Sequence, residues 1–283
     1  MSDDKDLTGR GFLITGANTG IGRVTAVELA KRGGTLILAG RSEERTRPVL
    51  DEIAALGGKA SFVALNLGEL GSTARAAKSI LDSGARLDVL INNAGIAGQR
   101  GLTKDGFEVT FGTNHLGPFL FTNLLLPRLR EGNAARIVNV SSAGHYRVKS
   151  IDWGAQRQPA RTISGFEEYC WSKLCNVLFT KELARGRAGA AVHSYSLHPG
   201  AVATDIWRSL PWPVGHIVKL FLLSVEEGAR TSLHCAASPE VAAEDGLYYD
   251  KCRVKEPSRL AKDEALAKKL WEVSEEMVAP HMK

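Results

Sequence analysis

Short apolar runs alternate with amphipathic stretches along the chain, which predicts strands and helices in turn. The expected strands, in chain order, are 11–15, 36–39, 61–65, 89–91, 136–140, 191–197 and 247–249. Helical spacing is seen in 25–32, 42–56 and 170–185 and, near the C-terminus, in Leu266, Leu270, Val273 and Met277. Parallel strands need crossovers and are buried on both faces, so they form continuous apolar runs. The pattern therefore predicts an α/β fold, a doubly wound parallel sheet with helices on both faces.

Two segments are expected to leave this core. Residues 143–168 are polar and irregular, and residues 205–230 are rich in aromatic and apolar side chains, Trp207 among them. Ligands in open α/β sheets bind beyond the carboxyl ends of the strands. We therefore expect both segments to wall a ligand pocket, with 205–230 as its lid. No linker or internal repeat divides the chain, so 1–283 is expected to be a single domain.

Composition and charge describe a folded protein with a large core. Apolar residues make up 44% and charged residues 24% of the 283 residues, which excludes a disordered or collagen-like chain. The net charge of +5 is too dispersed to favour nucleic acid as the main partner. The four cysteines form no CxxC pair, so we expect reduced thiols and a cytoplasmic location. No signal peptide and no stretch of about 20 apolar residues that could span a membrane is expected.

A glycine-rich segment, Thr15-Gly-Ala-Asn-Thr-Gly-Ile-Gly22, joins the first expected strand to the first expected helix. Glycine here lets the backbone approach a pyrophosphate and lets the helix pack closely on the strand. Free N–H groups at the helix N-terminus then face the anionic phosphates. This placement predicts a dinucleotide-binding site in a Rossmann-type fold.

The GxxxGxG spacing of this loop and several later motifs resemble the short-chain dehydrogenase/reductase family. The motifs are Asn92-Asn-Ala-Gly95, Thr113-Asn-His-Leu-Gly117, Ser141-Ser142, Tyr169-Cys-Trp-Ser-Lys173 and Pro199-Gly200 with Thr204. Phrases such as TGANTGIG and TSLHCA look most like the retinol dehydrogenase branch of that family. The resemblance implies hydride transfer between a nicotinamide cofactor and a carbonyl or alcohol. The longer step from Ser142 to Tyr169 than in compact members puts the shape of the substrate pocket in question.

The resemblance implies Tyr169, Lys173, Ser142 and Asn114 as catalytic residues. Tyr169 and Lys173 are four positions apart and would share one face of a helix. A free tyrosine has a pKa of about 10. A nearby ammonium stabilises the phenolate, so we expect Lys173 to bring the pKa of Tyr169 toward neutrality. Ser142 would stabilise charge on the substrate oxygen, whereas Ser141 is expected to bond to backbone at the strand end.

By resemblance, Asn114 binds a water that relays protons from Lys173 to solvent, and Lys173 binds the nicotinamide ribose. A locally bonded helix amide is the alternative for Asn114. The full set expected to bind the cofactor is Gly16, Asn18, Thr19, Gly20, Ile21, Gly22, Arg23, Arg41, Asn66, Leu67, Asn93, Ala94, Gly95, Tyr169, Lys173, Pro199, Gly200, Val202 and Thr204.

Charge after the second expected strand indicates which nicotinamide cofactor is used. NAD enzymes of this fold place a carboxylate there for the ribose 2′-OH, but this chain has Gly40 and then Arg41. Arginine pairs with a 2′-phosphate through charge-assisted hydrogen bonds, and Arg23 adds positive charge. We therefore expect NADP(H), with a solvated helix cap as the alternative for Arg41. Asn66 stands where the family has an aspartate at the adenine, and its amide oxygen can accept from the exocyclic amine.

The expected substrate contacts are Ser142, His145, Tyr169 and Trp207, with a solvated loop histidine as the alternative for His145. The apolar character of 205–230 favours a lipophilic carbonyl, such as a retinoid, steroid or polyketide. No HExxH or Cys–His cluster indicates a metal, and no GxSxG indicates a hydrolase. The resemblance implies a homodimer or homotetramer, although retinol dehydrogenase-like members vary.

Two other functions stay open. A protochlorophyllide-type reductase also carries YxxxK but reduces a ring double bond, and binding of a chlorophyll precursor would identify it. A non-catalytic NADP(H)-binding redox sensor would have no use for Tyr169 or Lys173. A Tyr169→Phe variant with unchanged measurable properties would favour this function.

Overall fold

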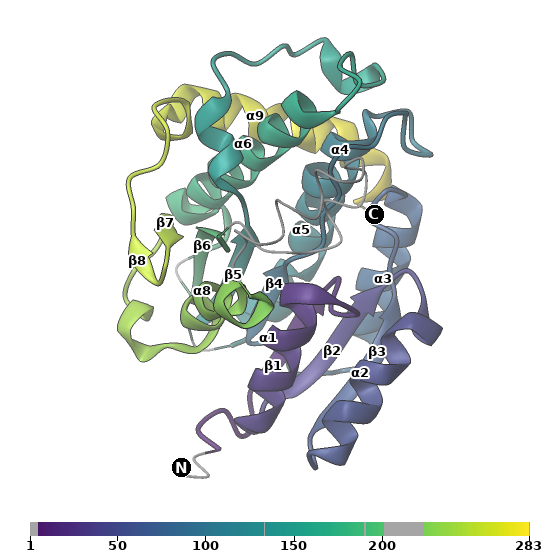
Figure 1. Ribbon diagram of the computed structural model, residues 1–283, viewed down its shortest axis with the longest axis vertical. Coiled ribbons are helices and arrows are strands. Elements are labelled where there is room, and N and C mark those ends of the chain that lie inside the picture. Colours follow the sequence, from purple (N-terminus) through teal and green to yellow (C-terminus); the bar gives the residue numbers. More distant parts are fainter. Residues whose placement is uncertain (1–4, 133, 190, 201–223, 283) are drawn as a thin grey trace.

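The computed structural model describes residues 5–132, 134–189, 191–200 and 224–282, which build one eight-stranded sheet between two layers of helices (Figure 1). The strands are β1 (Gly11–Thr15), β2 (Thr35–Gly40), β3 (Lys59–Ala64), β4 (Val89–Asn92), β5 (Ala135–Val140), β6 (Val192–His198), β7 (Leu247–Asp250) and β8 (Arg253–Val254). Their order across the sheet is β3-β2-β1-β4-β5-β6-β7-β8. The expected doubly wound fold is confirmed. One correction is β8, which pairs antiparallel with β7, whereas an all-parallel sheet was expected.

The helices divide between the two faces because side chains alternate along each strand. The longer helices are α1 (Gly20–Lys31), α2 (Glu43–Ala55), α3 (Leu70–Asp82), α5 (Gly117–Arg130), α6 (Phe166–Glu182), α8 (Val225–Ala237) and α9 (Glu264–Val278). Phe12 and Ile14 of β1 share a core with α1, α2 and α8. Leu13, between them, belongs to the opposite core with α3, α5, α6 and α9.

The remaining helical pieces are short. They are α4 (Val109–Phe111), η1 (Gly112–Leu116), η2 (Ala143–Arg147), η3 (Ala155–Arg157), η4 (Leu183–Arg187), η6 (Pro239–Val241), η7 (Leu260–Lys262) and η8 (Ala279–His281). Of these, η1 is a π-helical turn that joins α4 to α5, and Asn114 lies in it. Single π-helical turns are often found at functional sites. The apolar pattern did not indicate this turn.

The sheet order reverses between β1 and β4, because the chain winds outward from β1 in one direction and from β4 in the other. Ligands of doubly wound folds bind at this point, beyond the carboxyl ends of the strands. The glycine loop follows β1, Asn93 to Gly95 follow β4, and Ser142 follows β5. The topology therefore gathers the expected motifs at one edge of the sheet.

The C-terminal helix α9 buries a face different from the expected one. Its fully covered residues are Ala267, Leu270, Trp271, Ser274 and Val278, while Leu266, Val273 and Met277 are partly covered. The ring of Trp271 lies 4.9 Å from that of Phe119 on α5 and 5.7 Å from that of Phe179 on α6, between ring centroids. Because Trp271 packs between these two helices, the buried face of α9 is centred on Trp271 and not on the expected line of Leu266, Leu270, Val273 and Met277.

Part of the expected lid belongs to the fold itself. Residues 225–230 form the start of α8, which packs against α1 and covers the sheet. Residues 205–223 of the expected lid, Trp207 among them, lie outside the residues described, and so do Val202 and Thr204. Among the helices that are described, none combines the length and the apolar character needed to cross a membrane.

Candidate active site

The glycine loop after β1 has the shape that the phosphate-binding hypothesis requires. Gly16 has φ of +70°, and a Cβ there would lie 2.9 Å from the Cα of Ala94. A Cβ on Gly22 would lie 2.5 Å from the amide nitrogen of Asn93. Within the described chain, Thr19 makes no capping hydrogen bond at the start of α1 and the first turn of that helix holds no acid. Its N-terminal N–H groups are thus available for an anion, so the loop fits a dinucleotide.

Asn93 and Ala94 connect this loop to the end of β4. The Asn93 amide donates to the carbonyls of Thr15 at 2.8 Å and Gly16 at 3.1 Å. The backbone nitrogens of Asn93 and Ala94 donate to the hydroxyl of Thr15 at 3.1 and 3.0 Å. The side chain of Asn93 therefore braces the cradle. Thr15 is a site residue that the sequence analysis missed, and its polar position at the end of an apolar strand was the available signal.

The other expected members of the loop differ in exposure. Thr19 is exposed and Asn18 is partly exposed. Ile21 is buried and packs with Ala229 of α8, so its side chain belongs to the core. Gly20 has φ of +57°, in the left-handed region that favours glycine.

The π-turn side chain of Asn114 joins the loop after β4 to α6. Its amide nitrogen donates to the carbonyl of Ile96 at 2.9 Å and to the hydroxyl of Ser172 at 3.0 Å. Its amide oxygen accepts from the Ile96 nitrogen at 2.8 Å. Both N–H groups of the Asn114 amide thus donate to segments distant in the sequence. The alternative of an amide bonded locally within its helix is therefore wrong. A Cβ on Gly95 would lie 3.4 Å from this oxygen.

Tyr169 and Lys173 share one face of α6, as expected, and both are buried. The Lys173 ammonium donates to the carbonyl of Val140 at 2.9 Å and lies 5.7 Å from the centroid of the Tyr169 ring. Ser142 follows β5, and its hydroxyl lies close enough to the Tyr169 phenol to act on the pKa of that phenol by hydrogen bonding. Ser141 donates to the backbone carbonyl of Lys173 at 2.7 Å, in the structural role expected for it.

The electrostatics of this pair differ from the expectation. Burial raises the pKa of Tyr169 above its usual value, and the hydrogen bond from Ser142 only partly opposes this. Burial also lowers the pKa of Lys173 to about 8. The expected lowering of the Tyr169 pKa by Lys173 is therefore wrong for these side chains, because desolvation of the phenol is the largest cause and raises its pKa. Lys173 itself has a pKa of about 8, within reach of physiological pH.

The candidate for cofactor choice, Arg41, follows β2 directly and is exposed. In the described part of the chain no carboxylate is paired with it. Arg23, in contrast, forms an ion pair with Glu52 at 2.8 Å. Its charge is partly neutralised, so the positive field expected from Arg23 is weaker than that from Arg41.

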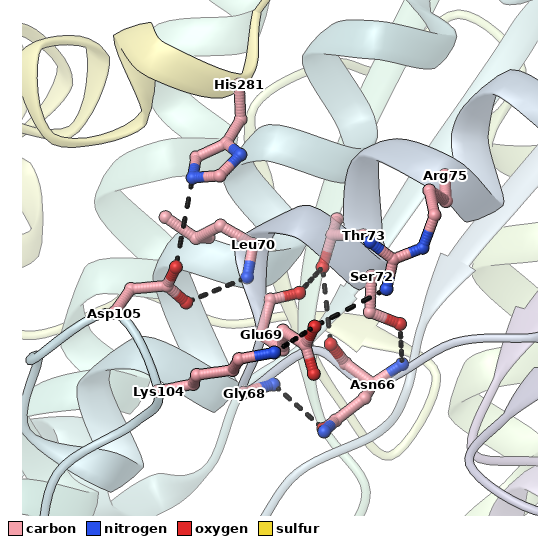
Figure 2. A network of polar contacts seen from close by, with 10 residues as sticks. All are labelled: Asn66, Gly68, Glu69, Leu70, Ser72, Thr73, Arg75, Lys104, Asp105 and His281. Atoms are coloured by element: carbon pink, nitrogen blue, oxygen red, sulfur yellow. Dashed lines mark hydrogen bonds and ion pairs between the residues drawn. The ribbon is translucent and has the colours of Figure 1, made fainter.

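Asn66 and Leu67 lie after β3. Asn66 begins a polar network, which Figure 2 shows. The amide oxygen of Asn66 accepts from the backbone of Gly68 at 3.2 Å, and its backbone nitrogen donates to Ser72 at 3.1 Å. One lone pair of that oxygen remains for a ligand. Leu67 is buried in the core, so it offers a ligand only its backbone.

The same network joins the start of α3 to distant segments (Figure 2). Asp105 accepts from the backbone nitrogen of Leu70 at 2.9 Å and lies 3.8 Å from the ring of His281. Glu69 pairs with Lys104 at 2.9 Å. The turn that carries Asn66 is therefore held by a loop after β4 and by the C-terminal end.

His145 does not lie where either sequence interpretation placed it. It is fully buried, so the solvated alternative is wrong, and both ring nitrogens contact backbone instead of facing outward. Pro199 and Gly200 follow β6 and are partly exposed. Across the described ranges, no group of three or more His, Cys, Asp or Glu side chains is placed to hold a metal ion.

A chain of buried hydrogen bonds between polar side chains, which we call the polar ladder, joins the strands that carry the site to α6. The sequence analysis did not predict it. Asn92 donates to Thr122 at 3.0 Å and to Asn139 on the neighbouring strand at 2.9 Å. Asn139 in turn donates to Thr180 of α6 at 2.9 Å. Two amides inside apolar strands were the signal, because buried amides are retained where they find partners.

Comparisons with known proteins agree with this geometry. The family model for short chain dehydrogenases matches residues 11–212. The chain is 40% identical to human retinol dehydrogenase 11 over 95% of its length and 85% of that protein, and 38% identical to human retinol dehydrogenase 13 over 96% and 85%. An uncharacterised protein from Mycobacterium paratuberculosis has a solved structure with a TM-score of 0.78, 35% identity, and coverage of 96% and 94%. The chain therefore belongs to the short-chain dehydrogenase family of oxidoreductases, which bind a nicotinamide cofactor.

Proposed function

We propose that this protein is an NADP(H)-dependent oxidoreductase that interconverts a lipophilic aldehyde or ketone and its alcohol, with Tyr169 as general acid and base. One observation carries the proposal. The phenol of Tyr169, the hydroxyl of Ser142 and the ammonium of Lys173 meet beyond the carboxyl end of β5, beside the glycine loop. A donor pair next to a dinucleotide cradle is the arrangement that carbonyl reduction needs.

The bound nicotinamide would supply or accept the hydride. In the reducing direction, Ser142 and Tyr169 donate hydrogen bonds to the substrate oxygen, which stabilises the negative charge that develops there. Tyr169 then transfers its proton to that oxygen. Lys173, with its pKa lowered by burial to about 8, is a group that can return a proton near neutral pH. We assign Asn114 the role of holding the loop at Ile96 against α6, next to Lys173.

Charge supports NADP(H) over NAD(H). Arg41 is an exposed arginine at the end of β2, where an acidic residue would serve a ribose 2′-hydroxyl. A guanidinium there forms charge-assisted hydrogen bonds to a 2′-phosphate. The retinol dehydrogenases named above support a retinoid-like substrate, and the four free thiols support a reducing, cytoplasmic setting.

The test combines cofactor binding with turnover. Fluorescence titration is expected to show tighter binding of NADPH than of NADH, and the nicotinamide absorbance is expected to fall with a retinal in a panel of lipophilic carbonyls. Tyr169→Phe should keep NADPH binding and lose turnover by about a thousandfold or more. Tyr195→Phe removes a remote buried hydroxyl and serves as the matched control. Tight binding without turnover across the panel would instead favour a redox sensor, and retained turnover in Tyr169→Phe would refute the mechanism.

A further inference from the structure

His145 lies three residues after Ser142, in a turn that faces the candidate site, but its side chain points into the protein. The side chain is fully buried. Its ring packs against Tyr248 at 4.7 Å and against Tyr146 at 4.0 Å between ring centroids. A polar ring buried this completely needs a partner for each nitrogen.

Both nitrogens have backbone partners, and these define the tautomer. Nδ1 lies 2.7 Å from the carbonyl oxygen of Ser142, and because a carbonyl only accepts, Nδ1 carries the proton. Nε2 is then an acceptor, and the backbone nitrogen of Ser258 donates to it at 3.2 Å. Burial lowers the pKa of His145 to about 4, so the ring stays neutral around pH 7 and keeps this pairing.

These bonds connect two segments that are 113 positions apart. The Ser142 carbonyl also accepts from the His145 backbone at 3.2 Å, and the Ser142 hydroxyl accepts from Gly144 at 3.1 Å. The Ser142 carbonyl is thus held by His145 through both the ring and the backbone, and the Ser142 hydroxyl is held by the backbone of Gly144. On the other side, Tyr146 donates to the carbonyl of Glu256, so the segment after β8 is fastened to the same turn twice.

The geometry around Gly144 shows why the orientation of this turn matters. A Cβ at Gly144 would lie 3.5 Å from the Ser142 hydroxyl oxygen and 3.6 Å from a ring carbon of Tyr169. Both side chains therefore lie next to Gly144 in this turn. A small rotation of the turn would separate the Ser142 hydroxyl from the Tyr169 phenol, although neither residue had been changed.

We propose that His145 is a positioning residue, which holds Ser142 against Tyr169 by donating from Nδ1 to the Ser142 carbonyl while accepting from Ser258 at Nε2. This inference rests on the proposed function, since it takes Ser142 as a donor to the substrate oxygen. It also gives the segment after β8 a role in the site, which the sequence alone did not suggest.

A double-mutant cycle on kcat tests the proposal. His145→Phe keeps a ring against Tyr248 and removes both nitrogens, and it is expected to lower kcat about tenfold with an unchanged NADPH Kd. In a Ser142→Ala background the same change should lower kcat less than about twofold, because no hydroxyl remains to be oriented. Equal losses in both backgrounds, or an unchanged kcat in His145→Phe, would overturn the proposal.

A second pair of variants uses the other end of the contact. Ser258→Pro removes the N–H that donates to Nε2, whereas Ser258→Ala keeps it and is the matched control. We expect a several-fold lower kcat in Ser258→Pro alone. Nitrogen-15 NMR of the ring should show a protonated Nδ1 and a bare Nε2 in the unsubstituted protein, and a protonated Nε2 would overturn the proposal even if His145→Phe failed to fold. Turnover retained by Tyr169→Phe would refute the proposed function instead, so the two failures are distinguishable.

Discussion

At the scale of single residues, burial decides the protonation behaviour of the candidate site. Tyr169 and Lys173 are both buried, and in each case desolvation acts against the charged form. Burial raises the pKa of the Tyr169 phenol and lowers the pKa of the Lys173 ammonium, so the two values, close together in free side chains, move apart. A lysine that titrates near pH 8 can exchange protons in the range where the reaction would run.

The buried ammonium of Lys173 is expected to lower the free energy of unfolding, although the proposed reaction needs it. Its pKa is lowered from 10.5 to about 8, so the unfolded chain binds more protons between these values and stability rises with pH across that window. Lys173→Met should therefore raise the free energy of unfolding at neutral pH by about 1–3 kcal/mol and abolish turnover. The gain should shrink as the pH approaches 10.5.

Urea denaturation at neutral and alkaline pH measures this difference. Lys78→Met, which replaces an exposed lysine paired with Asp82, is the control and should show no comparable stabilisation. A destabilised Lys173→Met at neutral pH would contradict the argument from burial.

Arg41 provides a second prediction at this scale. Arg41→Asp should weaken NADPH binding by about tenfold or more and favour NADH relative to NADPH, because a carboxylate repels the 2′-phosphate and accepts from a 2′-hydroxyl. Paired fluorescence titrations of the two cofactors measure the ratio. Arg45→Asp makes the same charge change within the first turn of α2 and should alter the ratio far less. An equal effect of both variants would contradict the role of Arg41 in selecting NADPH.

At the scale of elements, polar contacts between strands and helices hold the site in place. The ladder from Asn92 through Asn139 to Thr180 crosses β4, β5 and α6 within the apolar interior. A buried amide that loses its partner costs about 1–3 kcal/mol of stability. Register between the strands, with Asn92 opposite Asn139, is what brings the two amides together.

The ladder predicts a measurable coupling. Asn92→Ala and Asn139→Ala should each lower the free energy of unfolding by about 2 kcal/mol. The double variant should cost less than the sum, since one substitution already leaves the other amide unpaired. Asn123→Ala, whose amide bonds only within α5 among the contacts described, should be additive with either. Urea denaturation measures all of these, and an additive Asn92–Asn139 pair would contradict the ladder.

At the scale of the whole molecule, the C-terminal helix completes the face formed by α5 and α6. Trp271 fills the space between Phe119 and Phe179 and is almost fully buried. In this chain α9 lies against α6. A homodimer or homotetramer remains a proposal, and light scattering of the purified protein would test it.

Trp271→Ala should lower the free energy of unfolding by about 3–5 kcal/mol, because the cavity it leaves lies between two packed helices. Trp153→Ala, at a partly exposed indole beneath Lys269, is the control and should cost clearly less. Chemical denaturation followed by circular dichroism checks both. Similar losses would mean that α9 contributes little to the core.

Several features followed from the sequence by itself. Seven strands, the helices α1, α2, α6 and α9, and the order of the glycine loop, the Asn92–Gly95 motif and the Tyr169–Lys173 pair were all predictable, because apolar periodicity and i, i+4 spacing are local properties. The helices α3, α5 and α8 were not among those named from the sequence. The role of Ser141 as a backbone donor was predictable for the same reason.

Tertiary structure alone decided the rest, because burial and long-range contacts do not appear in local spacing. It placed Asn114 in a π-helical turn, paired Arg23 with Glu52, and raised the pKa of Tyr169 where proximity to an ammonium suggested the reverse. It also buried His145 between Ser142 and Ser258. The desolvation of a group and the partner of a buried nitrogen depend on segments that are far apart in the sequence, as His145 and Ser258 are by 113 positions, and only the packed chain brings those segments together.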